Sequence, residues 1–274
     1  MGHHARLHRP GRAIDRLWRR VATLLSFTLF GVGALVLTLC WFPLALLLFR
    51  SARRREWWVQ RSIRSSFRLF LWLMSLLGVM SYRVQGAERL AQESGCLLVA
   101  NHPSLLDYVL LAAVAPRCDC LVKASLWHNP VMGGVIRAAG YLPNAEGAAL
   151  LPLCQQKLAS GGLLLIFPEG TRTTPGQALQ LQRGAANIAV RCGADLRLVH
   201  IRCTPGTLTK QDRWYHIPPR RPHFEVMVGE RAAGAPFLPE GEPPAGAPAN
   251  LTHKLPRALA FPSGSGADGL MEER

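Results

Sequence analysis

Two residues that together can move a proton, His102 and Asp107, stand five positions apart in the sequence. The apolar run 96–100 predicts a buried strand, and Pro103 with the leucines after it predicts the first turn of a helix. Asp107 would then lie one turn into that helix. Residues five apart on one helix point about 140° away from each other, so the pair meets only if His102 lies outside the helix and folds back.

A histidine held in this way can act as a general base. A carboxylate on one ring nitrogen fixes the tautomer and leaves the other nitrogen free to accept a proton from a hydroxyl group. The alternative is a histidine that caps a helix, next to a first-turn carboxylate that the helix dipole favours.

A second polar stretch, Phe-Pro-Glu-Gly-Thr-Arg at 167–172, also follows an apolar run (163–167) that predicts a strand. Gly170 lets the backbone approach a ligand closely, Thr171 offers a hydroxyl, and Arg172 has a planar guanidinium that matches phosphate oxygens. A plain turn after a strand is the alternative. Open α/β sheets bind ligands at the carboxyl ends of their strands, which is where both stretches are expected.

Asn-His-Pro-Ser-Leu-Leu-Asp at 101–107 and the stretch 167–172 together resemble the signatures of the glycerolphosphate acyltransferase family, which includes the bacterial lysophosphatidate acyltransferases. The resemblance covers roughly residues 80–230. It implies a membrane-bound O-acyltransferase in which His102, oriented by Asp107, deprotonates an acceptor hydroxyl. The alkoxide then attacks the thioester of an acyl-CoA or an acyl-carrier protein directly. The family requires no metal and no cofactor.

The resemblance also implies contacts between the substrates and a set of residues in or near the motifs: Asn101, Ser104, Lys123, Glu169, Gly170, Thr171 and Arg172. A solvated lysine at a strand end is the alternative for Lys123. The family usually has an arginine shortly after the next Gly-rich stretch, but the sequence 140–144 holds none. This departure weakens the expectation that the acceptor is lysophosphatidate itself. We expect His200 to be a core histidine rather than a second base.

From residue 82 the sequence predicts strands that alternate with helices, which indicates an α/β fold with a mostly parallel sheet flanked by helices. Strands are expected near 82–85, 97–100, 120–123, 163–167, 196–203 and 224–228, and helices near 104–114, 125–139, 148–160 and 177–192. We therefore divide the chain into a basic arm with membrane-associated helices (1–80), an acyltransferase domain (81–230) and a Gly/Pro/Ala-rich tail expected to be disordered (231–274).

The composition favours an anionic partner, because 32 Lys and Arg against 17 Asp and Glu give a net charge of +15. Arginines flank an uncharged apolar run at 21–49, which predicts a membrane-anchoring helical region that contacts anionic lipid headgroups. The sequence shows no signature of a nucleic-acid-binding module, so nucleic acid is not an expected partner. Seven scattered cysteines indicate a reducing compartment. The expected location is the cytoplasmic face of a bacterial-type inner membrane.

Two topologies stay open for the run 21–49: a single span, or a hairpin that turns near 31–33 or is kinked before Pro43. The hairpin keeps both Arg-rich flanks on the cytoplasmic side. Residues 61–80 predict a helix with an apolar face and a basic stripe, which suits the membrane interface; packing on the protein core is the alternative. A membrane scaffold with an acyltransferase-like fold, or acylation of a lipid without phosphate, remains the alternative to the function above.

Overall fold

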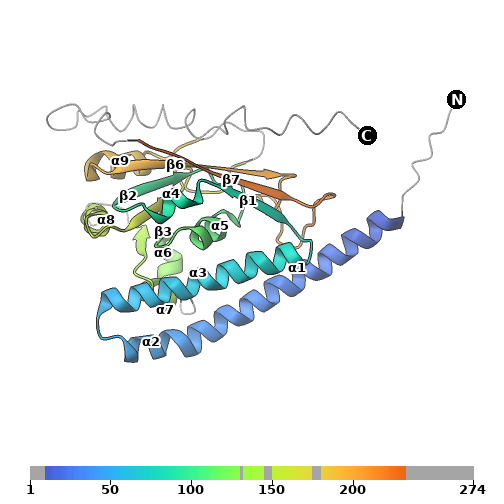
Figure 1. Cartoon of the computed structure of the whole chain (residues 1–274), viewed down its shortest axis with the longest axis horizontal. Helices are drawn as coiled ribbons and strands as arrows, with labels where there is room; N and C mark the ends of the chain where they lie inside the picture. Colours follow the sequence, from blue (N-terminus) through green and yellow to red (C-terminus); the bar gives the residue numbers. More distant parts are fainter. Residues whose placement is uncertain (1–9, 130–131, 145–149, 175–179, 233–274) are drawn as a thin grey trace.

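The computed structural model describes residues 10–129, 132–144, 150–174 and 180–232. Parts of five sequence-based predictions lie outside these residues: positions 1–9 of the basic arm, positions 130–131, 148–149 and 177–179 of three helices, and the tail from 233 to 274. Figure 1 shows a sheet in the upper half of the view and a long pair of antiparallel helices along its lower side.

A seven-stranded sheet forms the centre of the protein, with the strand order β1-β7-β6-β2-β5-β3-β4. Its strands are β1 (Ser81–Gln85), β2 (Cys96–Ala100), β3 (Asp119–Lys123), β4 (Leu142–Asn144), β5 (Leu163–Ile166), β6 (Asp195–Thr204) and β7 (His223–Ala232). Every neighbouring pair is parallel except β6 and β7. The α/β class with a mostly parallel sheet is therefore confirmed.

Helices cover both faces of this sheet, which is why its central strands are continuous apolar runs. Successive side chains of a strand point to opposite faces. On one face, Leu98 and Leu165 pack in a core with helices α3 (Ala52–Leu76) and α5 (Asp107–Val114). On the other face, Leu97 and Leu164 pack in a core with α8 (Leu150–Ala159) and α9 (Arg183–Cys192).

The N-terminal apolar run forms one long helical segment and not a hairpin within itself. Helix α1 (Pro10–Val36) continues through a π-helical turn, η1 (Leu37–Trp41), into α2 (Phe42–Leu48). The expected turn near 31–33 is wrong, because the helix runs on through both glycines there. The irregularity sits just before Pro43, whose ring nitrogen has no N–H to donate to the preceding turn.

The chain reverses only at residues 49–51, and α3 then returns along α1 (Figure 1). Among the described residues, one helix is long and apolar enough to cross a membrane, Ala13–Leu48 with 36 residues. Only 11% of its most apolar window is buried, so most of this surface faces outward and not into a protein core.

The apolar face of α3 was predicted to lie at a membrane interface, and this prediction is wrong. Phe70, Leu71 and Met74 are buried in the core between α3 and the sheet. Arg64, from the expected basic stripe, donates to the carbonyl oxygens of Ala113 and Val114, which are unpaired at the C-terminal end of α5. Tertiary packing therefore uses the amphipathic pattern that a lipid surface could also have used.

Two further differences from the prediction lie between β3 and α8. The helix expected at 125–139 is divided into α6 (Ala124–Trp127) and α7 (Met132–Ala138). At Gly133 a Cβ atom would lie 2.4 Å from the carbonyl oxygen of Trp127, so this close approach of the two helices requires glycine. Strand β4 was not predicted, because three residues around a proline carry almost no periodic signal. The short helix α4 (Ala87–Ala91) was also not predicted.

Candidate active site

The sheet topology brings the two sequence motifs together. Strands β2 and β5 are parallel neighbours, and Val99 pairs with Ile166 near their carboxyl ends. His102 follows the first strand and Phe167 follows the second, and their rings stack with centroids 4.1 Å apart and an interplanar angle of 19°. The aromatic ring thus fixes the plane of the imidazole from one side.

His102 and Asp107 form a hydrogen-bonded pair. Nδ1 of His102 lies 2.9 Å from Oδ2 of Asp107, and an ionised carboxylate is only an acceptor, so Nδ1 carries the proton. The side chain of His102 is 18% exposed, whereas that of Asp107 is completely buried. Nε2 is therefore the ring nitrogen left to accept a proton from a bound molecule.

The backbone between the two residues differs from the prediction. Helix α5 begins at Asp107, so Pro103 precedes the helix and Asp107 lies at its start and not one turn into it. The reason is that residues 104–106 are held by the segment that connects β6 and β7. Ser104 Oγ donates to the carbonyl of Thr207 at 2.9 Å, and the N–H of Leu105 donates to the carbonyl of Leu208 at 3.1 Å.

Asp107 is fixed by its own loop as well as by His102. The backbone N–H of Ser104 donates to Asp107 Oδ2 at 2.6 Å, so this oxygen accepts two hydrogen bonds. Oδ1 is buried and has no hydrogen-bond partner among the described residues. Burial raises the pKa of the Asp107 carboxyl to about 6, although the hydrogen bond from His102 opposes this change.

Glu169 connects the two motifs. Its Oε1 accepts hydrogen bonds from the backbone N–H of His102 and from Thr173 Oγ1, both at 2.9 Å. The N–H of Thr173 in turn donates to the carbonyl of His102 at 2.7 Å. His102 is therefore bonded to the second motif through both of its backbone polar groups.

Two other predicted substrate-binding residues are engaged inside the protein. The side-chain amide of Asn101 both donates to and accepts from the backbone of Ile201 in β6, at 2.7 Å in each case. Ser104 is completely buried and bonded to Thr207. These contacts, like those of Glu169, position the loop that carries His102. His200 is buried in β6, where the sequence analysis expected a core histidine.

The cationic residues of the prediction, Arg172 and Lys123, line the same cavity as His102. One guanidinium nitrogen of Arg172, Nη1, donates to the carbonyls of Leu208 and Thr209 at 2.9 and 2.8 Å. The other two, Nε and Nη2, make no hydrogen bond to the described residues. Gly170 has φ +65°, a left-handed conformation that glycine adopts without strain, and Thr171 next to it is exposed. Lys123 is exposed at the end of β3.

A cavity of about 1570 Å³ opens at this site. His102, Lys123, Thr171 and Arg172 line it, together with apolar side chains of α1, α3, α5 and α7. Deep in its apolar part, Tyr108 and Tyr141 join their hydroxyl groups at 2.7 Å, and both contribute to the lining. The arrangement offers a proton acceptor, the cations Lys123, Arg172 and Arg191, and a large apolar space, which suits the acylation of a polar hydroxyl by an apolar chain.

The sequence analysis did not find several residues of this site. The sequence contained a hint of the stacking of Phe167 on His102, because Phe167 is the last residue of the apolar run 163–167. The contacts from Thr207 to Thr209 had none, since they come from a connecting segment more than 100 positions from His102. The tyrosine pair had none either, because each tyrosine alone reads as an ordinary core residue.

Comparisons with known proteins point to an acyltransferase. Residues 81–203 match the family model described as Acyltransferase. The chain is 27% identical to the 1-acyl-sn-glycerol-3-phosphate acyltransferase of Pseudomonas aeruginosa over 216 residues, which cover 76% of this chain and 79% of that protein. It is 35% identical to the protein of the same name from Helicobacter pylori over 133 residues, 46% of this chain and 54% of that protein.

Two further proteins are informative. The lyso-ornithine lipid O-acyltransferase of Pseudomonas aeruginosa is 38% identical over 117 residues, 41% of this chain and 44% of that protein. The crystal structure of the 1-acyl-sn-glycerophosphate acyltransferase from Thermotoga maritima superimposes with a TM-score of 0.65 at 22% identity, covering 90% of this chain and 100% of that one. At this identity the structural likeness shows the fold.

The class of this protein follows from the fold, the motifs and these matches: it is an acyltransferase. Residues 81–203 match the acyltransferase family model, and the chain is similar to the 1-acyl-sn-glycerol-3-phosphate acyltransferases, as the two motifs predicted. Acyl transfer to a glycerolipid acceptor is the activity that the matches support.

Proposed function

We propose that this protein is a membrane-bound O-acyltransferase that moves a fatty acyl group from a thioester to a hydroxyl of a lysophospholipid. The observation that carries the proposal is the His102–Asp107 pair at the mouth of the large apolar cavity. Nε2 of His102 takes the proton of the acceptor hydroxyl, and Asp107 stabilises the imidazolium that forms. The oxygen attacks the thioester carbon, and the thiolate of an acyl-CoA or an acyl-carrier protein leaves and takes a proton.

The apolar part of the cavity is the proposed site of the acyl chain. Side chains from α1, α3, α5 and α7 line it, and the hydrogen bond from the Tyr108 hydroxyl to the Tyr141 hydroxyl lowers the cost of having these two polar groups in an apolar lining. Each methylene that enters this space gains about 0.8 kcal/mol. The depth of the cavity would therefore set the preferred chain length.

Ile136 offers a test of this placement, because it is 4% exposed and lines the cavity. Ile136→Trp should lower kcat/KM for the longest accepted acyl chain about tenfold relative to a chain two carbons shorter, since two methylenes are worth about 1.6 kcal/mol. Ile136→Ala should move the preference toward longer chains. Competition between acyl donors of different length measures both. If both variants fold and keep the wild-type preference for acyl-chain length, the acyl chain binds elsewhere.

For the acceptor, we propose that Arg172 and Lys123 hold a phosphate group. Nε and Nη2 of Arg172 are the donors that remain after Nη1 has bonded the carbonyls of Leu208 and Thr209. A guanidinium anchored through one nitrogen presents the others in a fixed direction, which is what recognition of an anionic headgroup needs. Gly170 and Thr171 complete the rim on this side.

Arg172→Lys should weaken use of a phosphate acceptor by about 1.5–3 kcal/mol, because an ammonium cannot bond the loop carbonyls and the phosphate with the same geometry. The apparent affinity for the acyl thioester should change far less. Steady-state kinetics with each substrate varied in turn measure the two effects. An equal loss for both substrates, or a loss for the donor alone, would show that Arg172 does not bind the acceptor headgroup.

A second candidate acceptor is an amino lipid without phosphate. Two observations favour it: the match to a lyso-ornithine lipid O-acyltransferase, and the lack of an arginine in the sequence 140–144. Purified protein given lysophosphatidate and lyso-ornithine lipid with one acyl donor would distinguish them by product mass. Acylation of lyso-ornithine lipid alone would replace the phosphate acceptor.

We also propose that the apolar segment Ala13–Leu48 attaches the protein to an anionic membrane, with the acyltransferase domain on the cytoplasmic face. Its outward side chains are apolar and exposed, among them Leu25, Leu29 and Leu47 at 46%, 50% and 81%. Clusters of arginine precede and follow this segment, where they would contact anionic headgroups. The proposed acceptor and its product are themselves membrane lipids.

A further inference from the structure

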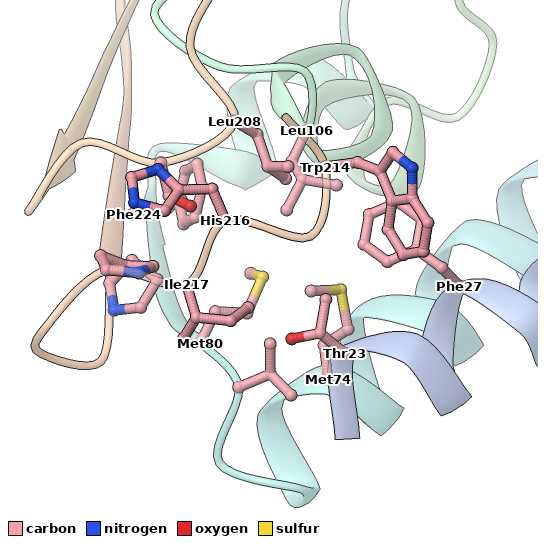
Figure 2. Close-up of a pocket in the computed structure, with 14 residues that line it drawn as sticks. Thr23, Phe27, Met74, Met80, Leu106, Leu208, Trp214, His216, Ile217 and Phe224 are labelled. Atoms are coloured by element: carbon pink, nitrogen blue, oxygen red, sulfur yellow. The ribbon is translucent and has the colours of Figure 1, made fainter. Parts of the chain in front are cut away.

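The segment that connects β6 and β7, residues 205–222, is fastened to helix α1. Arg19 of α1 is 2% exposed, and its guanidinium donates to the carbonyls of Pro218 and Pro219 at 3.0 Å each. The ring of Trp214 lies 5.8 Å from the ring of Phe27 of α1, and Figure 2 shows the two side chains against each other at the edge of a small pocket. The segment therefore keeps a fixed place beside the proposed membrane helix.

The outer side of this segment is aromatic and basic. Trp214 and Tyr215 are 44% and 51% exposed, and their rings meet edge to face at 5.6 Å. Arg213 donates to the hydroxyl of Tyr215 at 2.6 Å. We call five of the exposed residues of this segment the β6–β7 surface: Lys210, Arg213, Trp214, Tyr215 and Arg220.

The charge of the β6–β7 surface is not neutralised from within the segment. Asp212 is the single acidic residue of 205–222. Its carboxylate turns back to accept hydrogen bonds from the N–H and the hydroxyl of Thr209, at 3.0 and 2.8 Å, and its other oxygen lies 3.2 Å from Nδ1 of His216. The cations are thus left for an anionic partner.

We infer that the β6–β7 surface rests on an anionic bilayer, as a second membrane contact beside α1. Aromatic rings with one polar end next to cations suit the headgroup level of a membrane, where Trp and Tyr are enriched. Within one turn of Arg19, Leu17, Trp18 and Val21 of α1 are more than half exposed, so the helix that holds this segment also presents apolar side chains. A soluble acidic partner would use the cations but not these apolar side chains of α1.

This inference rests on the proposed membrane attachment and adds the β6–β7 surface as a second place where the protein contacts the membrane. The same segment supplies the carbonyls of Leu208 and Thr209 that hold Arg172, and the carbonyl of Thr207 that holds Ser104. Contact of the β6–β7 surface with headgroups would therefore place the acceptor side of the active site next to the lipids.

The test measures the emission of Trp214 in the full-length protein. Subtracting the spectrum of Trp214→Phe from that of wild type isolates this emission, and the same subtraction with Trp127→Phe provides a partly buried ring of α6 as a control. Spectra are recorded in detergent and in vesicles of phosphatidylglycerol and phosphatidylcholine. The vesicles contain either ordinary lipid or lipid brominated close to the headgroup.

We expect brominated lipid to quench the Trp214 emission by about half or more, as for a ring at the headgroup level, and vesicles to protect it from acrylamide. Lys210→Gln and Arg213→Gln should each lower the ratio of lipid-quenched to acrylamide-accessible Trp214 emission about fivefold. Arg191→Gln removes the same charge from α9, at the opposite end of the sheet in Figure 1, and should leave the ratio unchanged.

Several results would overturn the inference. If the other tryptophans are quenched by brominated lipid while Trp214 stays accessible to acrylamide, the protein is on the membrane but the β6–β7 surface faces water. If wild type does not associate with vesicles at all, the proposed membrane attachment fails first. Protection of Trp214 in detergent that grows with protein concentration would assign the surface to a second copy. If Arg191→Gln lowered the ratio as much as Lys210→Gln and Arg213→Gln do, the effect would come from the net charge of the protein and not from the β6–β7 surface.

Discussion

Replacing His102 with alanine should lower turnover by about 10²–10⁴, because no other group can accept the hydroxyl proton at the same place. Folding should be almost unaffected. Alanine loses the ring contacts with Asp107 and Phe167 but keeps the two backbone hydrogen bonds, to Glu169 and from Thr173, that hold this loop to the second motif. Turnover with saturating substrates, measured beside the melting temperature, separates loss of chemistry from loss of structure.

A matched control for this variant is His128→Ala. His128 is exposed at the end of α6 and has no place in the catalytic proposal, so turnover should stay as in wild type. Turnover of His102→Ala within about threefold of wild type would exclude His102 as the base, since a positioned base contributes at least about a hundredfold.

Asp107→Asn should lower turnover by a similar factor, about 10²–10⁴, while the protein stays at least as stable as wild type. The neutral amide cannot stabilise an imidazolium as the carboxylate does. Stability should not fall at neutral pH, because burial raises the pKa of this carboxyl to about 6 and so disfavours the charged form in the folded state. Because the pKa of this carboxyl is higher in the folded protein, folding favours its protonated form. Ionisation at a pH above about 6 therefore lowers the free energy of unfolding of wild type, whereas asparagine does not ionise.

The same pKa predicts the acid side of the activity profile. Wild-type turnover should fall as the pH drops through about 6, where Asp107 becomes neutral and stops stabilising the charge on His102.

Asp119→Asn is the matched control for Asp107→Asn, because Asp119 is also completely buried but contacts Gln60 and Lys157 away from the cavity. It should alter stability and spare turnover per folded molecule. If Asp107→Asn kept its turnover while Asp119→Asn lost turnover per folded molecule, Asp107 would have no role in the mechanism.

The sequence alone predicted six of the strands and the meeting of the two motifs, for a physical reason. Central strands of a parallel sheet are buried on both faces and stand out as apolar runs, and motifs at the ends of such runs must share an edge of the sheet. The predicted position of Asp107 in its helix was wrong. Ser104 and Leu105 donate hydrogen bonds to the carbonyls of Thr207 and Leu208, so α5 begins only at Asp107. Local propensity contains no information about a segment so distant in sequence.

The N-terminal region shows a different limit of sequence analysis. An amphipathic helix has one apolar face whether it covers a lipid surface or a protein core, so α3 could not be placed from its pattern. Exposure in the structure separates the cases: Phe70 is 4% exposed in α3, whereas Leu47 of α2 is 81% exposed. In the same way, the role of Asn101 depended on its partner Ile201 in β6, and that of Glu169 on its partner His102 in the first motif.

The bonds between Glu169 and His102 also bear on how this family could diversify. The two residues stand 67 positions apart, yet the base is located by the second motif and not by the chain that lies between. Insertions, deletions and substitutions in β3, α6, α7, β4 and α8 can therefore reshape the cavity without displacing the imidazole. Evolution could exchange one lipid for another in that interval, whereas a change at Glu169 would remove the carboxylate that accepts from the backbone N–H of His102.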